Sequence, residues 1–241
     1  MIVVTVPAFN ESRNLIKCVE LLMQETLKFN EEFSIIIAED GSTDGTDILA
    51  KLLKALDSRI IYFNSTKKLG RGLALKQAWS KIEGDVYVFI DADLATDMRY
   101  YPKLINSIRE GNDLATGSRY IKGAKVNRPI LRDFASRIYN KTIRMIYKDG
   151  VFDHQIGFKA FSKRLIKDEL DKCTSTNWFW DTEIIVRSIH DNYKFIEFPV
   201  EWEEKKGKKT PLKRLISDII IHGIGLIKLK SSLEKMDQVD D

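Results

Sequence analysis

Two aspartates one residue apart, Asp91 and Asp93, directly follow the apolar run VYVFI. Carboxylates behind a buried strand are costly as bare charges, unless water or a cation compensates them. Carboxylate oxygens are the ligands that Mg²⁺ and Mn²⁺ prefer, and these ions also bridge the oxygens of a diphosphate. The spacing therefore predicts a metal–diphosphate site, with a solvated loop as the simpler alternative.

A second acidic segment, EDGSTDGT, begins at Glu39 and Asp40, where another apolar run ends. Asp40 at such a strand end could accept hydrogen bonds from a nucleobase or a ribose. The alternative is local, because Asp-Gly-Ser is turn chemistry and Thr43 or Asp44 could cap the helix that follows. The first apolar run is followed by PAFNE and not by GxGxxG, which argues against a dinucleotide-dependent dehydrogenase.

Arg71 lies between two glycines in LGRGLAL, at the start of a helical pattern. Gly70 and Gly72 would let backbone N–H groups, together with Arg71, approach a phosphate at the helix N-terminus. The alternative is a plain helix start that contains two glycines.

The aromatic segment WFWDTE combines two tryptophans with two acids. A tryptophan face could hold a sugar ring while Asp181 or Glu183 hydrogen-bonds its hydroxyls. In the alternative interpretation, Trp178 and Trp180 belong to the core and Asp181 caps a helix.

Short β-branched runs alternate with helical patterns in the first half of the chain, which is typical of βαβ units around a parallel sheet. Strands are predicted over residues 2–6, 34–38, 59–63, 85–90 and 113–118, and helices over 14–27, 46–56, 70–82 and 101–109. A later run, GFKAF, is also strand-like. Ligands of such sheets bind beyond the carboxyl ends of the strands. Polar residues from four strand ends are therefore expected at one shared edge: Asn10, Glu11, Glu39, Asp40, Asp91, Asp93 and Arg119.

The C-terminal part of the chain is amphipathic and basic. Residues 205–230 hold eight basic side chains and one acid, Asp218, and apolar residues recur at helical spacing after Pro211. We expect an amphipathic helix over residues 211–230 and a frayed polar tail over 231–241. The helix either packs on the domain or lies in a membrane interface, where its lysines meet anionic head groups. A second apolar stripe precedes it: Leu131, Phe134, Ile138 and Met145.

The composition is that of a folded domain, with 241 residues of which 44% are hydrophobic and 31% charged. The net charge of +4 does not by itself indicate a nucleic-acid partner. Cys18 and Cys173 are too few for a disulfide framework, which favours a reduced, cytoplasmic setting. Residues 1–6 are expected to form a strand and not a signal peptide, and no apolar run is long enough for a spanning helix. The three histidines are scattered, and we expect them at the surface.

Seven segments occur in a fixed order: PAFNE, EDGSTDGT, LGRGLAL, DADLAT, GSR, DHQIGFKAF and WFWDTE. Together they resemble glycosyltransferase family 2, and within it the dolichyl-phosphate hexosyl synthases, over residues 2–211. The resemblance implies a Rossmann-like GT-A fold for residues 1–210, which binds a nucleotide-diphospho-sugar with Mg²⁺ or Mn²⁺. It also implies transfer of the hexose, with inversion, to a polyprenyl or dolichyl phosphate.

The motifs and this resemblance together assign roles to individual residues. Asp91 and Asp93 would hold the metal, and Asp93, Arg119 and Asp181 would serve the transfer step. The nucleotide would contact residues of the first strands and their loops: Pro7, Ala8, Asn10, Glu11, Asp40, Gly70, Arg71 and Asp91. The acceptor phosphate would meet Arg132, Ser136 and, from the basic stretch, Lys209.

The chain departs from the family pattern in two of these segments. The usual DDGS is EDGS here, with Glu39 in the first acidic position. The DADLQ common in the mannosyl branch is DADLAT here, which together with DHQIGFK resembles the glucosyl branch and favours UDP-glucose over GDP-mannose.

The acceptor decides whether a base is needed. A phosphate monoester is already anionic near neutral pH and needs positive charge to hold it. A saccharide hydroxyl must lose a proton, which would require Asp181 or Glu183 as the base. A third alternative is a nucleotide-sugar-binding subunit without turnover. The favoured interpretation is an enzyme attached peripherally to the cytoplasmic face of a membrane, and the oligomeric state stays open.

Overall fold

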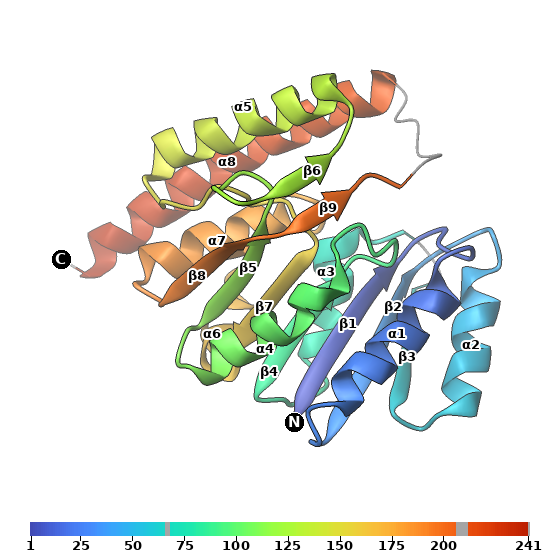
Figure 1. Cartoon of the computed structure of the whole chain (residues 1–241). Helices are drawn as coiled ribbons and strands as arrows, with labels where there is room; N and C mark the ends of the chain where they lie inside the picture. Colours follow the sequence, from blue (N-terminus) through green and yellow to red (C-terminus); the bar gives the residue numbers. More distant parts are fainter. Residues whose placement is uncertain (66–67, 206–211, 241) are drawn as a thin grey trace.

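A seven-stranded sheet lies at the centre of the computed structural model, which describes residues 1–65, 68–205 and 212–240 (Figure 1). The strands lie in the order β3-β2-β1-β4-β7-β5-β8. Their bounds are β1 (Ile2–Ala8), β2 (Phe33–Asp40), β3 (Ile60–Ser65), β4 (Val86–Ile90), β5 (Leu114–Ser118), β7 (Phe158–Ser162) and β8 (Phe195–Pro199). Neighbouring strands are parallel except at β7, which pairs antiparallel with β4 and β5. The predicted α/β fold with a mostly parallel sheet is confirmed.

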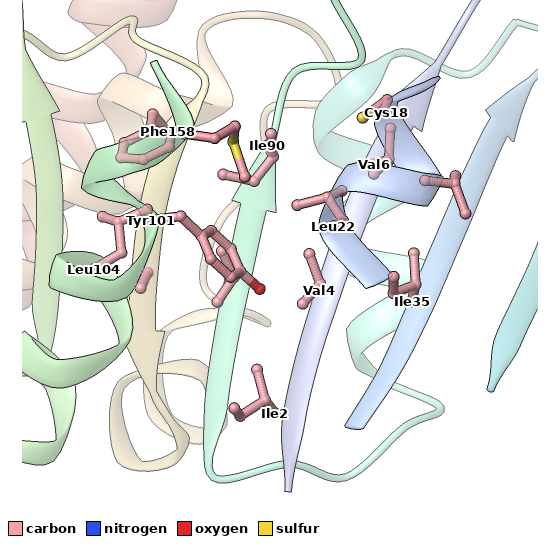
Figure 2. Packing of buried hydrophobic residues seen from close by; sticks show 14 of the residues in the cluster. Ile2, Val4, Val6, Cys18, Leu22, Ile35, Ile90, Tyr101, Leu104 and Phe158 are labelled. Carbon is pink, nitrogen blue, oxygen red and sulfur yellow. The ribbon is translucent and has the colours of Figure 1, made fainter. Parts of the chain in front are cut away.

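Helices cover both faces of this sheet. One face carries α1 (Leu15–Leu27), α2 (Thr46–Leu56) and α4 (Tyr101–Arg109), and the other carries α3 (Arg71–Trp79), α6 (Lys163–Glu169) and α7 (Trp180–His190). Ile2 and Val4 of β1 pack in the first core, whereas Val3 packs in the second. Figure 2 shows the first core, in which Leu22 and Tyr101 approach β1 and β4. Because both faces are covered, β1 is a continuous apolar run and not an alternating one.

The direction of β7 brings a further segment to the functional edge. Phe158, the first residue of β7, pairs with Ile90, the last residue of β4. The carboxyl ends of β1, β2, β4 and β5 therefore share one edge with the amino end of β7. The shared edge expected for the ends of β1, β2, β4 and β5 is confirmed, and the loop of residues 149–157 joins it.

A small two-stranded ribbon, formed by β6 (Lys125–Asn127) and β9 (Glu201–Glu203), lies beside the loop that follows β4. Trp202 of the ribbon forms an isolated β-bridge with Thr96. The backbone N–H of Glu203 donates to the carbonyl of Ala95 at 2.8 Å. The ribbon is thereby fixed to the segment that contains Asp93.

Helices α5 (Ile130–Tyr147) and α8 (Leu212–Asp240) lie side by side against α7 (Figure 1). In α8, side chains are described for residues 220–235 and 238. Leu229 packs with Ile143 and Val186, and the Tyr147 hydroxyl donates to the carbonyl of Leu226 at 2.5 Å. The helix continues to Asp240, so the expectation of a frayed tail is wrong for residues 231–240, and Leu233 is also buried against this cluster; residue 241 lies outside the described residues. Within the described residues, no helix is long and apolar enough to cross a membrane.

The expectation of surface histidines is wrong for His154 and His222. His154 is fully buried, with its two ring nitrogens each 2.8 Å from a side-chain oxygen of Asn140 or Asp149. His222 of α8 is buried against the rings of Tyr139 and Phe179. Both histidines are buried by contacts with α5, and the positions of the three histidines in the sequence do not predict how α5 packs on the domain.

Candidate functional site

The loops that follow β1 and β2 are tied to each other. The backbone N–H of Asn10 donates to the Ser42 hydroxyl and the Asn10 side chain accepts from the Thr43 N–H, both at 2.9 Å. The N–H of Glu11 donates to the Thr46 hydroxyl at the start of α2, also at 2.9 Å. Two of the predicted nucleotide-binding residues thus lie against the EDGSTDGT loop.

Three further predicted nucleotide-binding residues end the first two strands. Pro7 and Ala8 are the last residues of β1, and Asp40 is the last residue of β2. The Asp40 carboxylate accepts hydrogen bonds from the backbone N–H groups of Leu69 and Gly70 at 2.5 and 2.9 Å. Asp40 therefore links β2 to the start of α3, whatever else it contacts.

The two glycines of LGRGLAL make room for the chain itself. A Cβ on Gly70 would collide with the carbonyl of Thr176, and one on Gly72 would lie 2.5 Å from the Cβ of Trp180. Gly70 also has a φ of 98°, a conformation that favours glycine. These contacts account for both glycines without a ligand, so their predicted approach to a phosphate stays a prediction.

Arg71, the first residue of α3, is buried and joins two carboxylates. Its Nη1 lies 3.1 Å from Oδ1 of Asp91, and its Nη2 forms an ion pair with Asp181. The guanidinium also stacks on Trp178, with Cζ 3.9 Å from the ring centroid. Burial lowers the pKa of Arg71 to about 10, although Asp91 opposes this shift. Arg71 therefore neutralises carboxylates inside the site and does not stand open at a helix N-terminus.

Asp91 packs directly on Gly157, just before β7. The N–H of Asp91 donates to the Gly157 carbonyl at 3.0 Å, and a Cβ at position 157 would overlap the Asp91 carboxylate. That carboxylate is 36% exposed. Gly157 thus provides the space in which Asp91 lies, a role that follows from the pairing of β4 with β7.

Asp93 lies in the turn after β4, and the chemistry of the two aspartates fits a divalent metal. Its Oδ1 accepts the N–H of Ala95 at 3.2 Å, and Leu94 between them has a φ of 50°. Mg²⁺ is commonly held by one or two carboxylates together with substrate phosphates. Among the described residues, no group of three or more His, Cys, Asp or Glu side chains could hold a metal. Asp91 and Asp93 remain the predicted carboxylate ligands of a metal at this edge.

Arg119, which follows β5, is held by Asp153 from the loop before β7. Asp153 accepts hydrogen bonds from the Arg119 backbone N–H, Nε and Nη2 at 3.0, 2.7 and 2.8 Å. Burial would raise the pKa of Asp153, but Arg119 holds it below the usual value. Burial would likewise lower the pKa of Arg119, but Asp153 raises it above the usual value. Arg119 is therefore held in one position, and Asp153 is a neighbour of Arg119 that the sequence pattern did not identify.

Lys159 on β7 is another buried cation that the sequence pattern did not identify. Its ammonium group donates to the carbonyl of Ile156, and its side chain is fully buried. Burial lowers the pKa of Lys159 to about 7, and the carboxylates of Asp153 and Asp91 oppose this shift. Cations and carboxylates thus balance beneath the strand edge: Arg71, Arg119, Lys159, Asp91, Asp153 and Asp181.

The residues expected to face the acceptor phosphate lie at the start of α5. Arg132 forms an ion pair with Glu204, and Ser136 is buried one turn later. Arg128, which the sequence analysis missed, reaches the same glutamate, with Nε 3.4 Å from Oε2. Lys209 lies outside the described residues. The structure therefore brings two arginines together where one was predicted.

A cavity of about 390 Å³ opens between the turn that contains Asp93 and the β6–β9 ribbon. Its volume is in the range of small-ligand sites. It is lined by Leu94, Ala95, Asp97, Lys125, Val126, Asn127, Glu201, Trp202, Glu203 and Lys205. Acidic side chains, basic side chains and one aromatic ring therefore line this space.

Both candidate bases of WFWDTE are buried and engaged. Asp181 has no exposed surface and pairs with Arg71. The Glu183 carboxylate accepts the backbone N–H groups of Thr174 and Ser175 at 3.0 and 2.8 Å and pairs with Arg187. Glu183 therefore fixes the loop before α7 instead of facing the strand edge.

The two tryptophans of this segment differ. Trp180 is a fully buried member of the second core, as the alternative interpretation expected. Trp178 is 44% exposed, and Arg71 stacks on its ring. Of these two tryptophans, only Trp178 offers an exposed ring surface beside the site.

Comparisons with known proteins find related sequences and similar folds. Residues 3–170 match the sequence family described as "Glycosyl transferase family 2". Glycosyltransferase AglD of Haloferax volcanii is 40% identical over 214 residues, which cover 88% of this chain and 34% of that protein. The dolichyl-phosphate beta-glucosyltransferase ALG5A of Trichomonas vaginalis is 30% identical, and the aligned part covers 93% of this chain and 75% of that protein. The polyprenol monophosphomannose synthase of Mycolicibacterium smegmatis is 29% identical, and the aligned part covers 84% of this chain and 77% of that protein.

Similar solved structures share the fold. Glucosyl-3-phosphoglycerate synthase from Mycobacterium tuberculosis, in complex with UDP, has a TM-score of 0.70 and 19% identity, covering 95% of this chain and 79% of that one. Its complex with Mn²⁺, UDP-glucose and phosphoglyceric acid has a TM-score of 0.69 at 18% identity, with the same coverage. The chain spans about a third of the length of AglD and about three quarters of the other relatives named here.

Proposed function

Because the chain belongs to glycosyltransferase family 2 and has the GT-A fold, we propose that it transfers a hexose from a nucleotide-diphospho-sugar to a polyprenyl phosphate. Relatives named as a dolichyl-phosphate beta-glucosyltransferase and a polyprenol monophosphomannose synthase support this class of acceptor. The sequences DADLAT and DHQIGFK favour UDP-glucose over GDP-mannose as the donor. Mg²⁺ or Mn²⁺ is the proposed metal, and a related fold has been solved with Mn²⁺ and UDP-glucose.

One observation carries the preference for a phosphate acceptor over a hydroxyl. A hydroxyl needs a base within hydrogen-bond reach, yet the carboxylates of Asp181 and Glu183 are both buried and already paired. Three arginines lie near this edge, Arg119, Arg128 and Arg132, and although each is paired with a carboxylate in this structure, their charge does not have to change for them to hold an anion. A phosphate monoester is anionic without a base and needs such groups to hold it. The site therefore suits a phosphate acceptor better than a sugar hydroxyl.

In the proposed reaction, an oxygen of the acceptor phosphate attacks the anomeric carbon as the bond from that carbon to the diphosphate breaks. The configuration inverts, and the electron pair of the broken bond leaves with the nucleoside diphosphate. A bound metal, held by Asp91 and Asp93, would supply stabilisation of the diphosphate's negative charge. Arg119 adds a positive charge that Asp153 keeps fixed in place. Arg71 keeps Asp91 oriented from the other side.

The nucleotide is proposed to lie over the ends of β1 and β2. Two features support this position: polar groups of the loops lie at the shared edge, and the Asp40 carboxylate accepts hydrogen bonds from the backbone at the start of α3. The proposed contacts are Pro7, Ala8, Asn10, Glu11, Asp40, Gly70, Arg71 and Asp91. Asp181 is proposed to act through Arg71 and to have no role as a base.

A membrane surface is the proposed location. Helices α5 and α8 expose two neighbouring rows of apolar side chains, here called the α5–α8 face: Ile130, Leu131, Phe134, Ile138, Met145, Ile220, Ile224 and Ile227. Exposed basic residues accompany them: Arg137, Lys141, Lys228 and Lys230. Apolar rows flanked by basic groups suit attachment in the plane of an anionic membrane. We place this attachment on the cytoplasmic face, which suits two unpaired, buried cysteines.

The test is a transfer assay. The purified protein is incubated with Mn²⁺, a short polyprenyl phosphate, and labelled UDP-glucose or GDP-mannose in parallel, and label is counted in the organic phase. Label from UDP-glucose alone is the expected result. Asp93→Asn should abolish this transfer while far-UV circular dichroism stays unchanged, because the variant removes one carboxylate charge from the metal site. Tight UDP binding without transfer from either donor would contradict the proposed reaction.

A further inference from the structure

His154 belongs to a buried hydrogen-bond network that joins the loop before β7 to α5. It has no exposed surface, and its partners Asn140 of α5 and Asp149 are 1% and 4% exposed. The Asn140 oxygen lies 2.8 Å from both the backbone nitrogen and Nδ1 of His154, and Oδ2 of Asp149 lies 2.8 Å from Nε2. Both ring nitrogens of His154 are therefore engaged, one by a helix and one by the loop itself.

The direction of these hydrogen bonds follows from the groups that can only donate or only accept. The backbone N–H of His154 always donates, so the Asn140 atom that faces it is the amide oxygen. The Asn140 amide nitrogen points the other way and donates to the Ser136 carbonyl at 2.8 Å. Since an amide oxygen only accepts, Nδ1 of His154 donates to it. Buried networks in which each polar atom has a partner hold their side chains in one arrangement.

The residue before His154 is the one that holds Arg119. The Asp153 carboxylate accepts hydrogen bonds from the backbone N–H, Nε and Nη2 of Arg119. Residues 149–157 belong to no helix or strand, so their backbone groups depend on side chains for partners. The position of Arg119 therefore depends on how this loop is anchored.

Two side chains anchor the loop on either side of the Asp153 α-carbon. Glu197 of β8 accepts the N–H groups of Phe152 and Asp153 at 2.9 and 2.8 Å. Asn140 of α5 accepts the next N–H along the chain, that of His154. Because peptide groups are planar, fixing the N–H groups on both sides of an α-carbon fixes the direction of its side chain. The ring of His154 reinforces the anchor on α5 with its own hydrogen bond to Asn140.

We propose that His154 is a positioning residue for the sugar transfer, which acts through Asp153 to hold Arg119 in place. Because His154 is fully buried, it acts through its neighbours and not by contact with a substrate. Arg119 stabilises the leaving diphosphate in the proposed reaction, and such stabilisation depends steeply on where the charged group lies. The inference rests on the proposed function for the reaction, whereas the chain of hydrogen bonds from α5 to Arg119 does not.

The first part of the test measures transfer kinetics in three variants. His154→Phe keeps a ring and removes both ring nitrogens. Asn140→Leu keeps the size of the side chain and removes the acceptor, whereas Asn140→Asp keeps an oxygen towards His154. We expect kcat to fall roughly tenfold in the first two variants while KM for UDP-glucose stays within about twofold, because Arg119 acts on charge that develops in the transition state. Asn140→Asp should stay within about threefold of the wild-type kcat.

The second part follows Arg119 without any substrate. Exchange of its Nε–H with solvent is measured by ¹⁵N NMR, and this group donates to Asp153 at 2.7 Å in a residue that is 6% exposed. The exchange should be roughly tenfold faster in His154→Phe and in Asn140→Leu. Tyr101→Phe is the control, since it removes a buried hydrogen bond of 2.7 Å to Thr26 on α1. It should lower stability without changing kcat or the exchange at Arg119.

The outcomes separate positioning from general stability and from the proposed function. Unchanged kcat and unchanged exchange at Arg119 in His154→Phe, with a native circular dichroism spectrum, would overturn the inference. An equal fall of kcat in Tyr101→Phe would also overturn it, because the effect would then follow stability alone. If His154→Phe does not fold, Asn140→Leu decides by the same two measurements. A wild type without transfer activity, together with faster exchange in both variants, would overturn the proposed function and leave the positioning of Arg119 by His154 standing.

Discussion

Gly157 controls where the carboxylate of Asp91 can lie. Gly157→Ala adds a Cβ that would overlap that carboxylate, so Asp91 must move away from its position beside Arg71. We expect Mn²⁺-dependent UDP binding to weaken by about tenfold or more, since overpacking of about 1–3 kcal/mol is transmitted to Asp91. Calorimetric titration of UDP with Mn²⁺ measures this effect.

The matched control for Gly157 is Gly223 in α8. A Cβ on Gly223 would meet no described heavy atom within 4 Å. Gly223→Ala should therefore leave UDP affinity unchanged. Unaltered affinity in Gly157→Ala as well would show that Asp91 does not bind the metal–nucleotide complex.

The ion pair between Arg119 and Asp153 should contribute strongly to stability as well as to the site. Asp153→Asn leaves the Arg119 guanidinium buried without its carboxylate, and we expect the free energy of unfolding to fall by about 3 kcal/mol. Asp57→Asn is the control, because Asp57 and its partner Arg59 are 25% and 40% exposed, so this partly solvated pair should contribute less than about 1 kcal/mol. Urea denaturation compares the two losses, and equal losses would contradict a buried, fixed Arg119.

Sequence alone places some of these residues and misses others for a clear reason. Asp40, Asp91 and Asp93 follow apolar runs, so their common edge follows from parallel strand order. Asp153 and Lys159 reach the site only because β7 runs antiparallel between β4 and β5. Neither residue type nor spacing encodes that direction.

At the scale of elements, α8 has one packed face and one exposed face. Leu229→Ala should lower the free energy of unfolding by about 3 kcal/mol, because Leu229 is buried against α5 and α7. Ile227→Ala, at a position 73% exposed, should change it by less than about 0.5 kcal/mol. Chemical denaturation followed by circular dichroism distinguishes the two. Equal, small effects would mean that α8 does not pack on the domain in solution.

Local patterns predict the short elements well and the long-range ones poorly. The helices expected over residues 46–56 and 101–109 are found with those bounds as α2 and α4. Their apolar residues recur at helical spacing within one or two turns, so local pattern suffices. The extension of α8 to Asp240 depends on contacts such as that of Arg187 with Ser232, 45 residues apart in the chain. The polar sequence SSLEKMDQVDD does not by itself predict such a contact.

At the scale of the whole molecule, the α5–α8 face should bind membranes. The double variant Leu131→Ser, Phe134→Ser removes two large apolar side chains that are 79% and 61% exposed. Partition onto phosphatidylserine-containing vesicles should fall roughly tenfold or more, from the loss of buried apolar area. Sedimentation of vesicles measures it.

The control for this face uses α2 on the other side of the sheet. Ile48→Ser with Leu52→Ser removes comparably exposed apolar groups, at 59% and 56%. Vesicle binding of this variant should match that of the wild type. Equal losses in both double variants would point to general hydrophobicity and against a specific face.

The two cysteines report separately on the two cores that cover the sheet. Cys18 belongs to the first core and Cys173 to the second, and burial raises the pKa of each thiol above its usual value. Since the thiolate is the reactive form, both should react with a disulfide reagent at pH 8 roughly a hundredfold more slowly than in urea. Stopped-flow absorbance measures the rates. A single fast thiol in the native protein would show that one layer opens without the other.

The position of β7 also has a consequence for how the chain folds during synthesis. The four strands β3, β2, β1 and β4 are complete by residue 90, but the partner that covers the other side of β4 ends at residue 162. Chains emerge from the N-terminus, so the run VYVFI of β4 would remain an unpaired apolar edge while residues 91–162 are being made. Such an edge invites pairing with other chains. Nascent chains should therefore depend most on chaperones just before β7 emerges, and this need should fall once Ser162 is free to pair.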